Sequence, residues 1–229
     1  MSSLSSNLVA STRKHPARVA LRCGDVELTY AEFDSGAARV ATLLAQAEVQ
    51  SGDRVGVMLS NTPAFAIAFY GIMYRGAAAV PMNTLLKARE VEFYLSNSGA
   101  KAMFATPAFA EQAQAGAAAV GAQCWIVDDA RLAELTAGLP EQEPVQRADN
   151  DTAVILHTSG TTGKPKGAEL THAGLGRNAE VIVRRLLKIR DDDVVMGCLI
   201  REAASHFGVT LPHPPQYSRA FPRNERPRQ

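Results

Sequence analysis

The sequence of 229 residues has little that would suit a secreted protein or a nucleic-acid-binding protein. It has only three cysteines, Cys23, Cys124 and Cys198, which are far apart and odd in number. They make no metal-binding or redox spacing, so the sequence favours free thiols in a cytosolic protein. The formal net charge is +1, which gives no electrostatic reason to expect nucleic acid or an anionic membrane surface as a partner.

Long apolar runs are also absent. The first 21 residues contain Arg13, Lys14 and Arg18 but no apolar core of signal-peptide length. No run approaches the roughly 20 residues that a membrane-spanning helix needs. Hydrophobic residues still make up 46% of the chain, which is enough for the core of one large domain or two small ones. The expected location is therefore the cytoplasm.

One stretch, residues 157–167 (HTSGTTGKPKG), carries most of the chemical information. The apolar residues 153–156 before it predict a buried strand, and Thr171 after it can cap a helix that begins at His172. The whole pattern predicts a strand, a loop, a short strand and a helix. Glycine lets backbone N–H groups approach a ligand closely, and hydroxyls and lysines add donors and positive charge. Such a loop suits phosphate oxygens, which need several donors and a cation together.

This loop differs from the Walker A phosphate loop. Only two residues separate Gly160 from Gly163, where Walker A needs four, and Pro165 follows Lys164. On composition alone, a mobile surface loop rich in Gly, Ser and Thr is the alternative. The ordered string TSGTTGKPKG, however, resembles residue for residue the phosphate-loop signature of the adenylate-forming enzymes. These comprise acyl-CoA synthetases, firefly-luciferase-like enzymes and peptide-synthetase adenylation domains.

The resemblance implies a site for the phosphates of ATP. Backbone and hydroxyl groups of residues 158–163 would contact the β- and γ-phosphates, and two lysines would offset their charge while phosphate oxygens share Mg²⁺. Pro165 would stiffen the loop. No catalytic residue and no metal ligand is assigned. The cofactor-binding residues are Thr158, Ser159, Gly160, Thr161, Thr162, Gly163, Lys164, Lys166 and Gly167.

Two histidines flank the motif. His172 is a lesser candidate for ligand contact, because a histidine at a helix start is more often structural or solvated. His157 stands where the family often has an aromatic residue. A basic cluster further on is expected on a solvated face near a helix C-terminus, where it suits the helix dipole. It comprises Arg184, Arg185, Lys188 and Arg190.

Apolar runs of strand length alternate with helical patterns before the motif, which favours a mostly parallel sheet with flanking helices. The sequence predicts a helix within residues 7–19 that stops near Pro16, a hairpin around Gly24, and a helix opened by a capping box at residues 29–32. Strands are expected at residues 54–59, 77–81, 101–105 and 123–127, and helices from residue 63, at 88–96 and at 106–120. The polar residues 139–151 are expected to connect two sheet layers.

The family resemblance extends from about residue 8 to about Leu199. Residues 15–21, 28–33, 52–55 and 76–83 also look like the N-terminal part of an acyl-CoA synthetase. The resemblance implies an α/β fold of stacked, mostly parallel sheets with flanking helices. Residues 1–199 would form an incomplete N-terminal AMP-binding domain, and complete members carry a small mobile C-terminal domain after it.

The resemblance also implies a reaction. A carboxylic acid, expected to be a fatty acid, attacks the α-phosphorus of ATP, and the acyl adenylate then passes its acyl group to a thiol, usually coenzyme A. The ribose, metal and catalytic-lysine positions of the family have no counterpart here. The expectation is therefore a truncated acyl-CoA synthetase limited to weak binding of ATP phosphates. The alternatives are a fragment of a peptide-synthetase or aryl-acid adenylation domain, and a non-catalytic remnant or interaction module.

The pattern changes after Leu199. Five of the chain's twelve prolines and four arginines fall within its last 18 residues, and such a stretch cannot extend a central strand. Residues 200–229 are expected to be a disordered or out-of-frame tail. A frameshift or truncation is favoured over a natural basic tail, because the resemblance stops in the middle of a motif. Translation of the other two frames beyond codon 199 distinguishes these cases.

Overall fold

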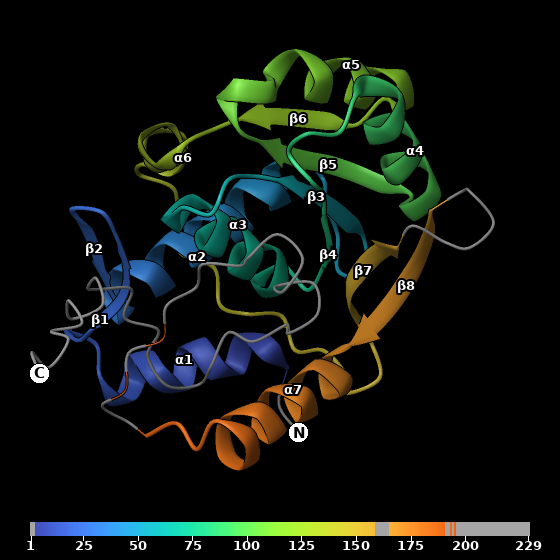
Figure 1. Cartoon of the computed structure of the whole chain (residues 1–229). Coiled ribbons are helices and arrows are strands. Elements are labelled where there is room, and N and C mark those ends of the chain that lie inside the picture. Colours follow the sequence, from blue (N-terminus) through green and yellow to red (C-terminus); the bar gives the residue numbers. More distant parts are fainter. Residues whose placement is uncertain (1–2, 159–164, 191–192, 194, 196–229) are drawn as a thin grey trace, which may run out of the picture.

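The described chain alternates helices and strands around one six-stranded sheet (Figure 1). The structure is a computed structural model that describes residues 3–158, 165–190, 193 and 195. Its strands are β1 (Val19–Cys23), β2 (Val26–Thr29), β3 (Arg54–Met58), β4 (Ala78–Pro81), β5 (Ala100–Ala105), β6 (Gln123–Ile126), β7 (Thr152–Thr158) and β8 (Lys166–Thr171). Its α-helices are α1 (Leu4–Lys14), α2 (Tyr30–Gln46), α3 (Pro63–Tyr74), α4 (Ala88–Ser98), α5 (Ala110–Val120), α6 (Asp129–Thr136) and α7 (His172–Val181). A 3₁₀ turn, η1 (Pro107–Phe109), precedes α5, and a π-helical turn, η2 (Ile182–Leu186), follows α7.

The sheet is mostly parallel and has the strand order β6-β5-β3-β4-β7-β8. The pairs β6–β5, β5–β3, β3–β4 and β4–β7 are parallel, and β8 runs antiparallel to β7. A separate two-stranded sheet is the antiparallel hairpin of β1 and β2. The predicted α/β class, with a mostly parallel sheet and flanking helices, is confirmed.

Helices bury both faces of the large sheet. Val55 and Val57 of β3 pack with α2 and α3, whereas Met58 packs with α4 and α5 on the opposite face. Figure 1 shows the same arrangement, with α4 and α5 on one side of the sheet and α2 and α3 on the other. A strand covered on both faces has a nearly continuous apolar sequence, which is why these strands could be predicted.

Local capping explains where several helices begin and end. Thr29 Oγ1 accepts a hydrogen bond from the Glu32 N–H at 3.2 Å, and the Thr29 N–H donates to Glu32 Oε2 at 2.8 Å, so the predicted capping box opens α2. Gly99 ends α4 with a φ of 64°, a left-handed conformation that glycine adopts easily. The first helix starts earlier than the expected residues 7–19, because α1 covers Leu4–Lys14 and ends before Pro16.

The sequence-based prediction missed α6. Asp128 caps this helix, since its side chain accepts a hydrogen bond from the Arg131 N–H at 2.8 Å. Leu132 lies in the core with an exposed fraction of 2%. The helix has only eight residues and a short apolar stripe, so its periodicity is weak.

The expected role of residues 139–151 was wrong in one respect. This segment returns the chain to the same sheet, because Val154 of β7 pairs with Ala79 of β4. No second sheet layer follows within residues 165–190. The segment does connect without regular secondary structure, as predicted.

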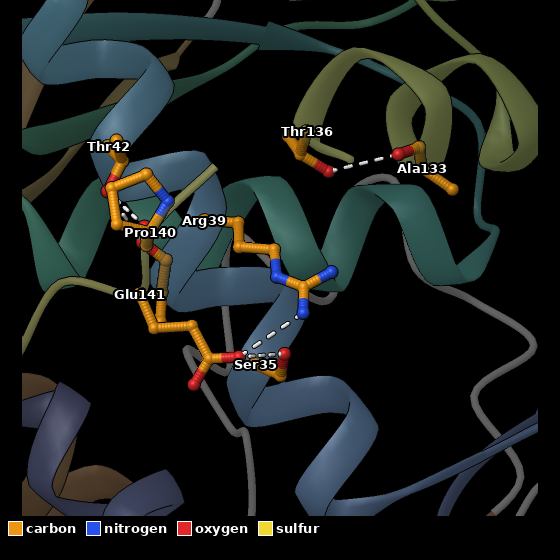
Figure 2. A network of polar contacts seen from close by, with 8 residues as sticks. Ser35, Arg39, Thr42, Ala133, Thr136, Pro140 and Glu141 are labelled. Atoms are coloured by element: carbon orange, nitrogen blue, oxygen red, sulfur yellow. Dashed lines mark hydrogen bonds and ion pairs between the residues drawn. The ribbon is translucent and has the colours of Figure 1, made fainter. Parts of the chain in front are cut away.

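Side chains of α2 hold the start of this segment (Figure 2). Thr42 Oγ1 donates to the Pro140 carbonyl at 2.7 Å, and Ser35 Oγ donates to Glu141 Oε1 at 2.5 Å. Arg39 lies 3.4 Å from the same carboxylate oxygen. The path from α6 to β7 is therefore fixed by contacts between residues about a hundred positions apart.

Two further predictions concern the C-terminal tail and membrane-spanning helices. The expected tail, residues 200–229, is outside them. None of the helices that the structure describes is both long enough and apolar enough to cross a bilayer.

A close helix contact predicts an asymmetric effect of two Gly→Ala substitutions. A methyl group at Gly71 of α3 would lie 2.4 Å from Val40 Cγ1 of α2, whereas one at Gly176 of α7 would meet nothing within 4 Å. We expect Gly71→Ala to lower the free energy of unfolding by about 1–3 kcal/mol through overpacking. Gly176→Ala should raise it by about 0.5–1 kcal/mol, because alanine suits a helix better. Urea unfolding of both variants measures this, and equal effects would contradict the packing argument.

Candidate functional site

The hairpin of β7 and β8 carries the candidate site. Buried Ala153, Val154 and Ile155 anchor β7 in the core, and β8 lies at the exposed edge of the sheet. Register pairs His157 with Gly167 and Thr158 with Lys166. The predicted strands and helix are confirmed in their order, since β8 follows β7 and α7 begins at His172 directly after β8.

The helix that follows the hairpin starts where its cap predicts. Thr171 Oγ1 accepts a hydrogen bond from the Gly174 N–H at 3.1 Å. The side chain thus satisfies one of the donors that the first turn of α7 leaves unpaired. This cap fixes the point at which the chain leaves the hairpin.

The described part of the predicted phosphate loop consists of its two ends. Thr158 and Lys166 form the last pair of the hairpin, and both are exposed. Gly167 stands next to Lys166 in β8. The remaining predicted site residues lie outside the described residues: Ser159, Gly160, Thr161, Thr162, Gly163 and Lys164.

Strand alternation separates the hairpin into two faces. Side chains opposite each other in a β-pair share a face, and successive side chains along a strand point to opposite faces. His157 therefore shares a face with Ile155, which packs in the core cluster of α4 and α5. Thr158 and Lys166 project from the other face. A hydroxyl and an ammonium group there provide a donor and a positive charge for an anion.

Gly167 has a packing role at its position. A methyl group there would lie 3.0 Å from Ile155 Cγ2, 3.3 Å from Asn97 Oδ1 and 3.4 Å from His157 Nε2. The absence of a side chain lets α4 and β7 approach β8 closely. The sequence suggested only a phosphate contact for this glycine.

His157 packs against α4. Its ring lies over Tyr94, with 4.2 Å between ring centroids and 22° between planes, and its Nε2 is 2.9 Å from Asn97 Oδ1. Its Nδ1 is buried and has no hydrogen-bond partner among the described residues. Burial lowers the pKa of His157 from its ordinary value of 6.5. The Tyr94 and Asn97 contacts were not predicted, because a separation of about sixty residues leaves no local signal.

His172 has a structural place. Its side chain is buried, with 2% exposure, and its Nδ1 accepts a hydrogen bond from the Leu4 N–H at 3.3 Å. This bond joins the start of α1 to the start of α7, which lie side by side in Figure 1. Burial, and then the nearby Arg147 charge, lower the pKa of His172 against the opposite effects of Asp151 and Asp149. These contacts agree with a structural role for His172, which the sequence favoured over ligand contact.

The basic cluster after α7 is solvated, as expected. All four of its residues are exposed, and Arg184 Nη1 lies 3.4 Å from Glu180 Oε1 one helical turn away. Among the described residues, no three His, Cys, Asp or Glu side chains gather as they would around a metal ion. Glu169 of β8 is paired with Thr152, whose hydroxyl donates to it at 2.6 Å.

Comparison with known proteins relates the chain to one family. The sequence profile of the family described as AMP-binding enzyme matches residues 8–201. A long-chain-fatty-acid–CoA ligase, FadD13, of Mycobacterium tuberculosis is 38% identical over 153 residues, which are 65% of this chain and 30% of the relative. A feruloyl-CoA synthase of Amycolatopsis is 33% identical over 209 residues, or 89% of this chain and 40% of the relative. The phosphinothricin tripeptide synthetase PhsC of Streptomyces viridochromogenes is 33% identical over 74% of this chain and 16% of its own length.

Solved structures show the same relation. Apo MatB from Rhodopseudomonas palustris superposes with a TM-score of 0.82 at 28% identity, over 95% of this chain and 45% of that chain. The inhibitor-bound N-terminal domain of FACL13 from Mycobacterium tuberculosis gives a TM-score of 0.77 at 30% identity, over 95% and 58% of the two chains. The chain thus spans less than half the length of the curated relatives that it matches.

Acid should destabilise this protein through His157 and His172. Both have a folded-state pKa below the ordinary 6.5, so the folded state favours the neutral rings. Below about pH 6.5 the unfolded chain binds protons that the folded chain does not, and the free energy of unfolding falls as the pH falls toward the folded-state pKa values. Urea titrations between about pH 7.5 and about pH 5 measure this loss.

A variant that lacks both groups provides the control. The double substitution His157→Tyr and His172→Gln should give a shallower loss of stability over the same interval, whatever its stability at neutral pH. An unchanged slope would show that other groups cause the acid sensitivity.

Proposed function

This chain belongs to the AMP-binding enzyme family, and we propose that it forms the ATP-phosphate-binding part of an acyl-CoA synthetase. The observation that carries the proposal is the β7–β8 hairpin, whose last pair holds Thr158 opposite Lys166 at the two ends of the signature 158–167. The ordered signature supplies further hydroxyls, backbone donors and Lys164 between these ends. Together these groups match the needs of a polyphosphate.

The proposed reaction makes a poor acylating agent into a good one. A carboxylate oxygen attacks the α-phosphorus of ATP, the bond to the bridging oxygen of the β-phosphate breaks, and pyrophosphate leaves. The thiol of coenzyme A then attacks the acyl carbonyl, loses its proton, and expels AMP. Groups that bind the β- and γ-phosphates stabilise the charge that develops on the departing pyrophosphate, which is the main form of catalysis in such transfers.

In this proposal Mg²⁺ binds together with ATP and has no separate protein site. The described residues at the hairpin do not make a metal site of their own, because no cluster of acidic, histidine or cysteine side chains lies there. An ion would be held by phosphate oxygens, as is usual for this metal. Lys166, and Lys164 with it, would neutralise phosphate charge directly.

The proposed carboxylic acid substrate and the proposed cellular compartment rest on other features of the sequence. The Gly-Ala-Glu-Leu-Thr-His sequence after the loop favours a fatty acid as the carboxylic acid. Similarity to PhsC keeps a peptide-synthetase adenylation domain as the alternative. A non-catalytic remnant is the other alternative. The exposed free thiol of Cys23 suits a reducing compartment, so we place the activity in the cytoplasm.

Removal of the two loop lysines should weaken phosphate binding. We expect Lys164→Ala with Lys166→Ala to raise the Kd for pyrophosphate and for Mg·ATP at least about tenfold, or about 1.4 kcal/mol, because two charge-assisted contacts are lost. Isothermal titration of the 229-residue chain measures both constants. Arg184→Ala with Arg185→Ala removes the same charge far from the hairpin and should leave both constants unchanged. Equal affinities in the wild type and the lysine variant would exclude the proposed site.

The 229-residue chain alone should not complete adenylation. Its match covers 30% of the CoA ligase FadD13 and 40% of the feruloyl-CoA synthase, so groups that such relatives carry outside the matched region do not take part in the assay. The loss of a transition-state contact typically costs a factor of about 10²–10³ in rate. Exchange of labelled pyrophosphate into ATP across a panel of fatty and aryl acids measures the activity. Robust acid-dependent exchange would contradict this expectation.

A further inference from the structure

The hairpin end is held by α4 in a way that no feature of the signature explains. Tyr94 and Asn97 are three residues apart, so they share one face of α4. Both contact His157, which stands one residue before the exposed Thr158. The Phe93 ring also meets His157 edge-on, at 6.4 Å between centroids. In Figure 1 the start of β8 lies beside α4.

We propose that Tyr94, Asn97 and His157 form a clamp that positions the ends of β7 and β8 for phosphate binding. These three are positioning residues, since they act through Thr158 and Lys166. The inference rests on the proposed function for its ligand. The clamp itself rests on geometry alone.

The clamp connects the hairpin to a rigid part of the core. Val91 and Leu95 of α4 are fully buried against the sheet, so the helix has a fixed place. Among the strands that the structure describes, the edge strand β8 pairs with β7 alone, and most of its residues are exposed. Without a side-chain anchor, little would fix the end of such a hairpin. Binding groups must be held within roughly half an ångström to be effective, and the clamp supplies that constraint.

The chemistry of the contact has two separable parts. The His157 ring stacks on Tyr94, which contributes packing beyond simple burial. With Asn97 Oδ1 as the acceptor, His157 Nε2 carries the hydrogen, and this bond fixes the rotation of the ring. Gly167 leaves room for the clamp, because a methyl group there would lie 3.0 Å from Ile155 Cγ2 and 3.3 Å from Asn97 Oδ1.

The clamp also leaves the functional face uncovered. His157 and Gly167 face α4, whereas Thr158 and Lys166 project from the opposite face of the hairpin. Helix α4 can therefore hold the hairpin from one side without hindering an anion on the other. A helix packed over Thr158 or Lys166 would instead block the approach of an anion.

Four single variants test the clamp, with one matched control. Asn97→Ala removes the hydrogen bond, His157→Phe keeps the stack without that bond, His157→Tyr keeps an aromatic ring with a polar end, and His157→Ala removes both contacts. Ser96→Ala alters an exposed neighbour on α4 and serves as the control. Because Asn97 is exposed, its substitution should leave the thermal unfolding midpoint near that of the wild type.

Two readouts are combined. The first is the Kd for pyrophosphate, which should rise about 3–10-fold in Asn97→Ala and more in His157→Ala, with His157→Tyr near the wild type. The second needs no ligand: trypsin cleavage after Lys166, followed by mass spectrometry, should accelerate severalfold in the same order. Lys164 precedes proline and resists trypsin, so the cut at Lys166 reports on the hairpin end. Ser96→Ala should match the wild type in both.

The outcomes separate the two proposals. If the wild type binds pyrophosphate and no clamp variant changes affinity or cleavage, the clamp is refuted while the phosphate site stands. If the wild type does not bind pyrophosphate, the proposed function fails, and the cleavage rates still decide whether α4 holds the hairpin. Changes that follow only the unfolding midpoint, with no rescue by His157→Tyr, would show general destabilisation and overturn the clamp.

Discussion

The pairing of β7 with β4 is the contact on which the candidate site depends. Through Val154 and Ala79, it joins the hairpin to a sheet whose central strands β3, β4 and β5 are largely buried. Among the described strands, β8 pairs with β7 alone, and its Leu170 side chain packs against the core. The described ends of the signature, Thr158 and Lys166, therefore depend on this edge of the sheet for their position.

Local signals made much of this fold predictable. The capping box at Thr29, the proline at the start of α3 and the cap at Thr171 act over three or four residues, and each marks a helix start in the structure. Apolar runs marked the buried strands for the same reason. Helix α6 was missed because its capping aspartate stands before a short helix with few apolar residues. The connection to β7 was misjudged because strand partners are chosen by packing far along the chain.

The candidate site, like the fold, was predictable from the sequence only in part. Sequence alone located the two strands and the helix that follows them, but not the antiparallel pairing of the strands. It did not show that Gly167 lies against Asn97, or that His157 stacks on Tyr94, because partners some sixty to seventy positions apart leave no periodic trace. The sequence analysis ranked His172 only as a lesser candidate for ligand contact and gave His157 no chemical role. The structure instead gives each of them a packing partner, α4 for His157 and α1 for His172.

The contacts of His157 show how a histidine ring fits between β7 and α4. The imidazole of His157 lies flat against Tyr94, a stacked arrangement that adds to the packing of the two rings. Imidazole adds a directed hydrogen bond to Asn97, but it also brings a buried Nδ1 without a partner among the described residues. A buried polar atom left unpaired costs free energy that the bond to Asn97 only partly offsets. A phenyl ring in this place would avoid that cost but would also lose the directed hydrogen bond to Asn97.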